Sequence, residues 1–452
     1  MDLGRIWIDL IFLMLQMKIA VLGYWKEWKS TYNWLLKQWY RKDQIDILDK
    51  SIDKDYLGKL DNYDLIFKSP WISIYLPEIQ KNINKITSQA DIFFEKYKWK
   101  IILVTWSKGK STTSTLMYKF LKQAGKSVKL VWNIWNPIFD EIDFENQPDY
   151  VIFEISSYML DSVKKIKTNY GILTNIYEVH TSWHKTHENY VNSKLRMIFE
   201  NPNGLFSVYK QVKSFFKTIP NNVVFFWEWT DYFFDDRFLY WKKYKISKNK
   251  VVLWWNHNYL NIVSCFPILE KENISQQVIE KVLSEFNWLE HRQEFVGEIN
   301  GIKFYNDSIA TIPESVLQAL ERFWNQIDTI ILWGKESGFD YSNVIEKINN
   351  LSLKNVILLP DSFDWLENKF ENKNVYKVSN LKDAVKIAKE KTEKWKICIL
   401  SPGAPSYNLF KNFEERGKLF KKYVGLRSEE CQKRSEEWVW DPKRIKRSEE
   451  KK

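Results

Sequence analysis

The sequence predicts an α/β protein of three domains: a Rossmann-like N-terminal domain, a central domain built around a parallel sheet like that of a P-loop ATPase, and a Rossmann-like C-terminal domain. Three observations support this prediction. Short apolar runs alternate with helical segments along the chain, one run leads into a phosphate-loop motif, and the last third repeats the alternation. The 452 residues have room for two or three domains, which we place at 17–97, 98–290 and 291–426.

The predicted strands and helices follow the apolar runs in each domain. In the N-terminal domain we expect a helix near 30–38, and a further helix at 113–125 in the central domain. The predicted strands are 19–23, 45–48 and 63–67, then 101–104, 150–154 and 170–175, and finally 302–305, 329–332, 355–359 and 397–400. Alternation of this kind is typical of parallel sheets with helices between the strands.

Residues 105–113 resemble a phosphate-binding loop. Thr105-Trp106-Ser107-Lys108-Gly109-Lys110-Ser111-Thr112 lies between a predicted strand and a predicted helix. In such a loop, backbone N–H groups, a lysine and a helix N-terminus converge on the phosphates. We expect Lys110 to neutralise the β- and γ-phosphates of ATP and Ser111 to bind Mg²⁺. The first position of the loop usually requires a backbone shape that a side chain obstructs, and here it is Trp106.

Tryptophan is over-represented in this chain and glycine is scarce. There are 14 Gly and 23 Trp, whereas average usage predicts about 32 Gly. Many Trp occupy turn positions between a strand and a helix: Trp25, Trp28, Trp71, Trp106, Trp132, Trp135, Trp254, Trp255, Trp288 and Trp333. Each becomes a recognisable turn when Trp is replaced by Gly. Our hypothesis is that many of these Trp are encoded by UGA codons, which the source lineage reads as Gly. The alternative is a Trp-rich protein. UGG codons at positions 106, 132 and 135 would establish that alternative.

Composition excludes several other classes of protein. The formal charge of +11 comes from lysines interspersed with acidic residues, which favours a solvated basic surface over nucleic-acid binding. The cysteines are three and unspaced, so neither a disulfide framework nor a zinc site is indicated. Residues 6–15 are apolar but too short to span a bilayer. We interpret 1–16 as a mis-called start, with a short membrane-surface helix as the alternative, and 427–452 as a charged tail.

Over about residues 17–425 the chain resembles the Mur ligases of peptidoglycan synthesis. Matching motifs occur in the family's order: Gly23 to Trp28, Ser69 to Ile72, Thr105 to Thr112, Trp132 to Trp135, Glu154 to Ser157, Asn175 to His180, Asn192 to Arg196, His257 to Asn261, Leu289 to Arg292, Asn306 to Ser308, and Leu400 to Gly417. The family has glycine at the turn positions that are Trp here, which independently favours the recoding hypothesis.

The resemblance implies an ATP-dependent enzyme that converts a carboxylate into an acyl phosphate, which an amino acid amine then attacks. ATP-binding residues implied are Thr105, Ser107, Lys108, Gly109, Lys110, Ser111, Thr112, Asn258, Asn261, Arg292 and Asp307. The last two match groups that bind phosphate and ribose. The implied metal ligands are Ser111, Glu154, His180 and a carbamylated Lys194, for two Mg²⁺ ions. Val179 departs from the acidic residue usual before that histidine. We expect His184 and His187 to be surface or substrate-side residues.

The resemblance also implies the substrates. Asp49, Ser69 and Asn133 would bind the uridine nucleotide of UDP-N-acetylmuramoyl-L-alanine, and Thr311, Ser401 and Phe410 the incoming glutamate. Ile309 and Ser337 stand where many members have lysine, so D-glutamate is expected but L-glutamate or another amino acid stays open. We expect a cytoplasmic monomer that binds no nucleic acid and has no membrane span. Alternatives are another Mur-type or folylpolyglutamate-type ligase, and a non-catalytic nucleotide-binding protein.

Overall fold

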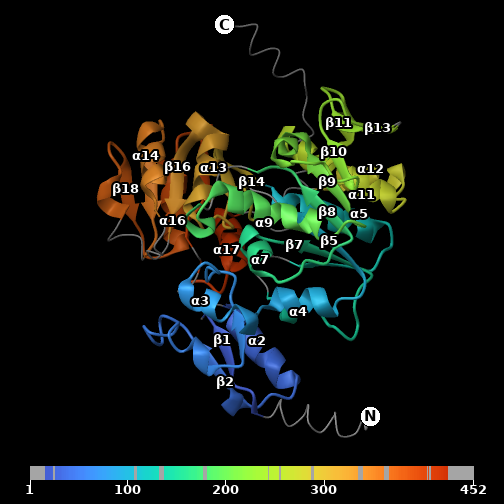
Figure 1. Ribbon diagram of the computed structural model, residues 1–452. Helices are drawn as coiled ribbons and strands as arrows, with labels where there is room; N and C mark the ends of the chain where they lie inside the picture. Colours follow the sequence, from blue (N-terminus) through green and yellow to red (C-terminus); the bar gives the residue numbers. More distant parts are fainter. Residues whose placement is uncertain are drawn as a thin grey trace, which may run out of the picture. The chain divides into compact units, whose positions relative to one another are not determined.

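The computed structural model describes residues 16–23, 26–105, 109–131, 137–176, 181–242, 244–253, 256–286, 290–333, 340–360, 366–404, 406 and 409–425. The predicted α/β class is confirmed: helices alternate with strands along most of the described residues (Figure 1). The chain divides into two compact units, Met1–Asn287 and Trp288–Lys452. The first contains two parallel sheets and a small antiparallel sheet, and the second contains one mixed sheet. The domain boundaries within these units stay a prediction.

The N-terminal sheet is parallel, in the order β2-β1-β3-β4. Its strands are β1 (Ile19–Leu22), β2 (Ile45–Leu48), β3 (Leu65–Lys68) and β4 (Ile86–Thr87), with helices α2 (Lys26–Lys37), α3 (Pro77–Lys81) and α4 (Gln89–Lys96). Every residue of β1 is buried, because this central strand packs apolar side chains on both faces. Ala20 and Leu22 contribute to one core cluster and Ile19 and Val21 to the other.

The central sheet is also parallel, in the order β10-β9-β8-β5-β7-β6. Its strands are β5 (Lys100–Thr105), β6 (Val128–Val131), β7 (Tyr150–Glu154), β8 (Tyr170–Leu173), β9 (Leu205–Tyr209) and β10 (Val223–Phe226). The helices are α5 (Lys110–Gln123), α6 (Ile138–Glu141), α7 (Ser157–Ser162), α8 (Thr181–His184), α9 (His187–Phe199), α10 (Asn256–Val263), α11 (Phe266–Lys271) and α12 (Gln276–Glu285). This order places the carboxyl ends of β5, β7 and β8 next to one another.

A three-stranded antiparallel sheet that the sequence did not predict follows β10. It consists of β11 (Tyr232–Phe234), β12 (Phe238–Trp241) and β13 (Tyr244–Ser247). Phe233 and Tyr240 stack across neighbouring strands with ring centroids 4.3 Å apart, which is a stabilising cross-strand pair.

The second unit contains a six-stranded sheet in the order β14-β15-β19-β16-β17-β18, in which only the β14–β15 pairing is antiparallel. Its strands are β14 (Glu294–Ile299), β15 (Ile302–Asn306), β16 (Ile327–Leu332), β17 (Asn355–Leu358), β18 (Asn374–Lys377) and β19 (Ile397–Leu400). The helices are α13 (Pro313–Phe323), α14 (Ser342–Asn350), α16 (Leu381–Lys391) and α17 (Phe413–Val424). Two apolar clusters, one containing Val316 and Ile330 and the other Ile331 and Phe420, form its core.

Several tryptophans have a backbone conformation that suits glycine. Trp39, Trp227, Trp229, Trp324 and Trp395 have φ values of 70°, 89°, 63°, 42° and 70°. A left-handed backbone brings the Cβ of an L-residue too close to the following carbonyl, and glycine avoids this cost. Trp39 and Trp229 are 90% and 93% exposed, so packing does not compensate. These angles favour glycine at five positions that the sequence hypothesis did not name. Of the turn positions that it did name, Trp28, Trp71 and Trp333 are described and do not have a positive φ, and Trp25, Trp106, Trp132, Trp135, Trp254, Trp255 and Trp288 lie outside the described residues.

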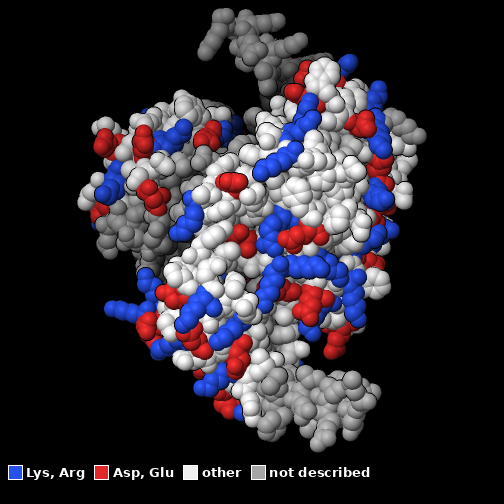
Figure 2. Space-filling view, viewed as in Figure 1, with Lys and Arg blue, Asp and Glu red and all other residues white. Residues whose placement is uncertain are grey.

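Charged side chains of both signs are mixed over the face of the molecule shown in Figure 2. This distribution agrees with the interspersed charges of the sequence. Within the described part of the chain, every helix is too short or too polar to cross a bilayer.

Candidate active site

The phosphate loop leads from β5 into α5 as predicted. Gly109 precedes the helix with φ 101° and ψ 4°, a left-handed conformation that glycine adopts without strain. The helix begins at Lys110, three residues earlier than predicted, and Ser111 is buried in its first turn. The N-terminus of a helix offers unpaired N–H groups and a partial positive charge, which suit an anion. Trp106, Ser107 and Lys108 lie outside the described residues.

Thr105 and Glu154 lie at the carboxyl ends of adjacent parallel strands. Val104 pairs with Glu154, and the N–H of Ile155 donates to the carbonyl of Val104 at 3.1 Å. The Glu154 side chain is only 5% exposed. Carboxylate oxygen is a preferred ligand of Mg²⁺, so Glu154 is held where it can meet a metal beside the phosphate loop.

Lys194 is buried next to the same strand ends. It lies on α9 with an exposed fraction of 2%, and its Nζ donates to Oγ1 of Thr105 at 3.1 Å. Its Nζ also lies 4.9 Å from the centroid of the Tyr190 ring. Burial holds the pKa of Lys194 well below that of a free lysine, and the positive charge of Lys110 lowers it further. A neutral amine is the form that reacts with CO₂, so this environment favours carbamylation.

His184 is buried, which excludes the surface position but not the substrate-side position among its two expected placements. It has no exposed area, and its Nε2 lies 3.0 Å from Oγ of Ser157, while its Nδ1 lies 3.3 Å from Oδ2 of Asp161. Ser157 and Asp161 belong to α7, the helix that follows Glu154. His184 therefore connects α8 to α7, whereas His187 is half-buried. The predicted metal ligand His180 lies outside the described residues.

Asn258 and Asn261 lie on α10, a helix that packs against α5. They are 3% and 6% exposed and one helical turn apart, so they share a face. The carbonyl of Asn261 accepts a hydrogen bond from Ser264 at 2.7 Å. Both amides thus lie beside the helix that begins at the phosphate loop.

The residues at these strand ends fit a magnesium site in their chemistry. Glu154 supplies a buried carboxylate, Ser111 a hydroxyl, and Lys194 an amine that CO₂ would convert into an oxygen ligand. Among the described residues, no group of three or more His, Cys, Asp or Glu side chains is placed to hold a metal. A site here therefore depends on donors of other types together with His180.

In the N-terminal sheet, Gly23, Asp49 and Ser69 follow the neighbouring strands β1, β2 and β3. The N–H of Gly23 donates to Leu48 at 2.8 Å and that of Ser69 to Leu22 at 2.9 Å, so the three turns meet at one edge. A Cβ at Gly23 would lie 2.9 Å from Cβ of Ser69. This is the edge at which Rossmann-like sheets bind ligands. Asn133 lies outside the described residues.

In the second unit, Asp307 and Ser401 follow the parallel neighbours β15 and β19. Oγ of Ser401 donates to Oδ2 of Asp307 at 2.8 Å, and the N–H of Gln293 donates to Oδ1 at 3.1 Å. Burial raises the pKa of Asp307 to about 7, against the opposing effects of the Ser401 hydrogen bond and the Arg292 charge. The structure therefore brings Asp307, Ser401 and Arg292 together.

Thr311 and Phe410 lie near the same strand ends. Thr311 follows Ala310, whose carbonyl accepts from the N–H of Gly403 at 2.8 Å. The ring of Phe410 meets that of Trp333 edge to face, with centroids 5.4 Å apart. Trp333 is 1% exposed, so it fills space directly after β16. Ser337 and the neighbouring Lys335 lie outside the described residues.

Two buried cations that sequence reasoning did not select support these turns. Arg416 has no exposed area and donates to Oγ and the carbonyl of Ser308 and to the carbonyl of Ala404. Lys68 is 2% exposed and donates to the carbonyls of Ser69 and Ile72. No local pattern distinguishes them from exposed cations, because their acceptors are set by the tertiary fold.

Comparisons with known proteins agree with this architecture. The family model described as Mur ligase middle domain matches residues 104–254. The chain is 31% identical over 394 residues to UDP-N-acetylmuramoylalanine--D-glutamate ligase of Clostridium tetani, covering 82% of this chain and 85% of that protein. The corresponding ligase of Oenococcus oeni is 30% identical over 436 residues, covering 90% and 96%.

A solved structure shares the fold at lower identity. The crystal structure of UDP-N-acetylmuramate-alanine ligase MurC from Thermotoga maritima has a TM-score of 0.53 and 16% identity, covering 90% of this chain and 99% of that chain. With the phosphate loop, the buried lysine beside it and sequence similarity along most of its length, the chain belongs to the Mur ligase family.

Proposed function

We propose that this protein is an ATP-dependent ligase that adds D-glutamate to UDP-N-acetylmuramoyl-L-alanine in cytoplasmic peptidoglycan precursor synthesis. The observation that carries the proposal is Lys194, a buried lysine of lowered pKa that is hydrogen-bonded to Thr105 beside the phosphate loop. Relatives named for this D-glutamate ligase activity, at about one third identity, specify the substrates.

The reaction proceeds in two steps. A carboxylate oxygen of UDP-N-acetylmuramoyl-L-alanine attacks the γ-phosphorus of ATP, and ADP leaves. The neutral amine of glutamate then attacks the acyl carbon, and phosphate leaves. The attacking nitrogen, which becomes positively charged, loses one proton to solvent and forms the amide. Phosphoryl transfer mainly needs positioning and neutralisation of charge. Lys110 and the N-terminus of α5 supply both at the β- and γ-phosphates.

Ser111, Glu154, His180 and carbamylated Lys194 would hold two Mg²⁺ ions. The ions would neutralise charge on the phosphates of ATP. The loop around the phosphates is assigned to Thr105, Ser107, Lys108, Gly109 and Thr112. Asn258 and Asn261 are assigned to the adenine side. Arg292 is assigned to phosphate and Asp307 to ribose. The lowered pKa of Lys194 and its hydrogen bond to Oγ1 of Thr105 support the assignment of a carbamate at this position.

The substrates are assigned to the two remaining strand edges. Asp49, Ser69 and Asn133 would bind the uridine nucleotide, and Thr311, Ser401 and Phe410 the glutamate. Gly23 supports the first assignment, because its close approach to Ser69 brings these two turns together at one sheet edge. The Asp307–Ser401 hydrogen bond supports the second, since it fixes the loop after β19. We also propose that the enzyme acts as a monomer.

A phosphate-release assay tests the function. It uses two full-length chains, one as written and one with Gly at 25, 28, 71, 106, 132 and 135. We expect the glycine form to release phosphate from ATP only when UDP-N-acetylmuramoyl-L-alanine and D-glutamate are both present, and the form as written to bind ATP poorly. Lys110→Met in the glycine form is the inactive control. The same assay with L-glutamate, other UDP-muramyl acceptors and folate acceptors separates the related ligases.

Absence of turnover that depends on both substrates, in both chains, would contradict the proposal. Preference for L-glutamate or another acceptor would retain the ligase chemistry and reassign its substrate. ATP binding without any turnover would instead support a non-catalytic nucleotide-binding protein.

A further inference from the structure

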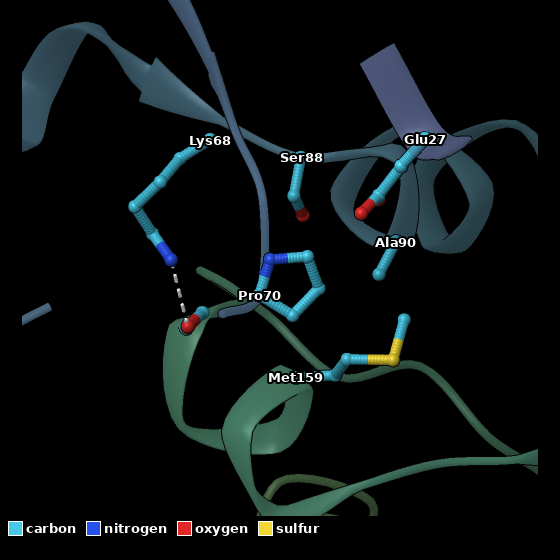
Figure 3. A pocket seen from close by; sticks show the side chains of 7 residues that line it. Glu27, Lys68, Pro70, Ser88, Ala90 and Met159 are labelled. Atoms are coloured by element: carbon cyan, nitrogen blue, oxygen red, sulfur yellow. Dashed lines mark hydrogen bonds between the residues drawn. The ribbon is translucent and has the colours of Figure 1, made fainter. Parts of the chain in front are cut away.

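Lys68 joins a substrate-side turn to a helix of the central sheet. It is the last residue of β3, and its Nζ donates to the carbonyl of Ser69 at 3.1 Å and to that of Ile72 at 2.8 Å. The same Nζ donates to Oγ of Ser162, the last residue of α7, at 3.2 Å (Figure 3). One ammonium group therefore holds both ends of the turn 69–72 and connects that turn to α7.

Glu27 faces the same small cavity as Lys68. The cavity has a volume of about 10 Å³ and is lined by Glu27, Lys68, Pro70, Ser88, Ala90, Met159 and Ser162. In Figure 3, Lys68 and Glu27 lie on opposite sides of Pro70. Glu27 lies in the first turn of α2, directly after the turn that begins at Gly23. Glu27 thus lies shortly after Gly23 in sequence, and Lys68 lies directly before the turn 69–72. Both charged residues line the cavity.

The charges of Glu27 and Lys68 depend on each other. Burial raises the pKa of Glu27 to about 7, and the charge of Lys68 opposes this rise. Burial lowers the pKa of Lys68 to about 8, while the charges of Glu27, Asp91 and Asp161 oppose this fall. Removing one partner of a buried pair leaves the other charge uncompensated, which is strongly unfavourable. The charge of each residue therefore lowers the cost of burying the other.

The position of Lys68 matters because the turns above it are tightly packed. A Cβ on Gly23 would be 2.9 Å from Cβ of Ser69 and 3.4 Å from Cδ1 of Ile72. A shift of the 69–72 turn would therefore change the spacing at the edge assigned to the uridine nucleotide. An apolar side chain of similar length would fill the same volume at a lower desolvation cost, but it would leave the carbonyls of Ser69 and Ile72 without this donor.

We propose that Lys68, with Glu27 as its charge partner, is a positioning residue that fixes the 69–72 turn for the uridine nucleotide and links this turn to α7. The proposal rests on the proposed function for the identity of the ligand. The hydrogen bonds to two carbonyls of one turn and to Ser162 carry it.

Three variants of the full-length chain with Gly at 25, 28, 71, 106, 132 and 135, which is the parent here, test it. Lys68→Met removes the ammonium but keeps the length of the side chain, and Ser162→Ala removes only the link to α7. Lys100→Met is the control, because Lys100 is a half-buried lysine of the same unit that is hydrogen-bonded to Glu272 at 2.8 Å and lies at the amino end of β5. The measurements are calorimetric affinities for UDP-N-acetylmuramoyl-L-alanine and for ATP, melting temperatures, and hydrogen exchange of residues 69–76.

We expect Lys68→Met to weaken affinity for the UDP substrate by tenfold or more and to change ATP affinity less than threefold. Ser162→Ala should weaken UDP-substrate affinity by two- to fivefold, and both variants should increase hydrogen exchange in 69–76. Lys100→Met should change neither the UDP-substrate affinity nor that exchange. Equal loss of both affinities in Lys68→Met and Lys100→Met would indicate a purely structural lysine and overturn the proposal.

Failure of the proposed function gives a different result. If the parent chain binds no UDP substrate, the ligand assignment fails, and hydrogen exchange alone decides the role of Lys68. Unchanged exchange at 69–76 in Ser162→Ala and Lys68→Met overturns the proposal even then. Should Lys68→Met not fold, the exchange and affinity of Ser162→Ala decide.

Discussion

Nζ of Lys194 lies 3.1 Å from Oγ1 of Thr105, the last residue of the strand that leads into the phosphate loop. The two residues are 89 positions apart in sequence, and both are buried. Because this amine is desolvated and faces the charge of Lys110, its neutral form is favoured. The hydrogen bond thus places a reactive lysine at the edge where phosphates are expected.

Replacing Lys194 tests this chemistry. We expect Lys194→Met to lower kcat by at least about 100-fold, or roughly 2.7 kcal/mol in the activation barrier, because the proposed function makes carbamylated Lys194 a metal ligand. In the parent, ¹³CO₂ should give a carbamate NMR signal that grows as the pH rises and more of the amine is neutral. Lys129→Met, which alters a half-buried lysine of the same sheet that pairs with Glu141 at 2.8 Å, should retain the activity and the signal. A fully active Lys194→Met protein would exclude a role as metal ligand.

Glycine should be found at the tryptophan positions with left-handed backbones. Mass spectrometry of the protein from its native source should identify Gly at 39, 227, 229, 324 and 395. In the chain as written, Trp39→Gly, Trp229→Gly and Trp395→Gly should each stabilise by about 0.5–1 kcal/mol. Relief of a left-handed strain of about 1–2 kcal/mol outweighs the extra entropy of unfolded glycine.

Trp34 supplies the control for these substitutions. It lies inside α2 and stacks on Phe139 with ring centroids 4.4 Å apart. Trp34→Gly should therefore destabilise by about 3 kcal/mol, because it loses packing and helix propensity. Tryptophan in the native peptides, together with losses of stability at 39, 229 and 395, would establish a Trp-rich protein.

Sequence reasoning located ten of the strands, because buried parallel strands are short apolar runs, but it did not predict β4, β6, β9, β10, β14 and β18. The predicted bounds of β2, β7 and β19 agree with the structure at both ends. The sheet β11–β13 was missed for a local reason. Its neighbouring turns use Trp227, Trp229 and Lys242 at positive φ, and these residue types carry no turn signal.

The candidate site was predictable only where a motif is local. The phosphate loop and the strand-end residue Glu154 could be located from adjacent apolar runs, whereas Asp307 was selected only through the family resemblance. His184 could not, because its burial depends on Ser157, 27 positions away. The same holds for Lys68, whose partner Ser162 is 94 positions away. Tertiary contacts, rather than local pattern, decide which polar residues are buried.

Asp307 should make stability depend on pH in a defined direction. Its pKa is raised from 3.8 to about 7, so the folded chain holds this proton more tightly than the unfolded chain. The resulting stabilisation is complete below pH 3.8 and is lost as the pH rises through about 7. Asp307→Asn removes this titration, so the parent should lose up to about 4 kcal/mol relative to the variant across that range.

Denaturant unfolding at pH 5, 6, 7 and 8 measures this difference. Asp340→Asn is the control, because it changes an exposed aspartate of the same unit and should leave the pH slope unaltered between pH 5 and 8. If the free energies of unfolding of the parent and of Asp307→Asn changed equally with pH, Asp307 would be ionised throughout this range, contrary to its burial.

Gly417 is required by the close approach of His291. A Cβ at Gly417 would lie 2.1 Å from Nδ1 of His291, and His291 is 2% exposed and 2.9 Å from Nδ2 of Asn306. Glycine to alanine in a helix normally stabilises by up to about 1 kcal/mol. Here overpacking should reverse the sign, so Gly417→Ala should destabilise by about 3 kcal/mol.

A double-mutant cycle identifies the cause of that loss. Adding His291→Ala to Gly417→Ala should cost less than His291→Ala costs in the parent, because removing the His291 ring also relieves the clash with the new Cβ. Lys418→Ala, an exposed neighbour on the same helix, should change stability by less than about 0.5 kcal/mol. Since His291 precedes Arg292 and Asn306 precedes Asp307, Gly417→Ala should also raise the KM for ATP. Additive losses in the cycle would show that His291 is not what excludes a side chain at 417.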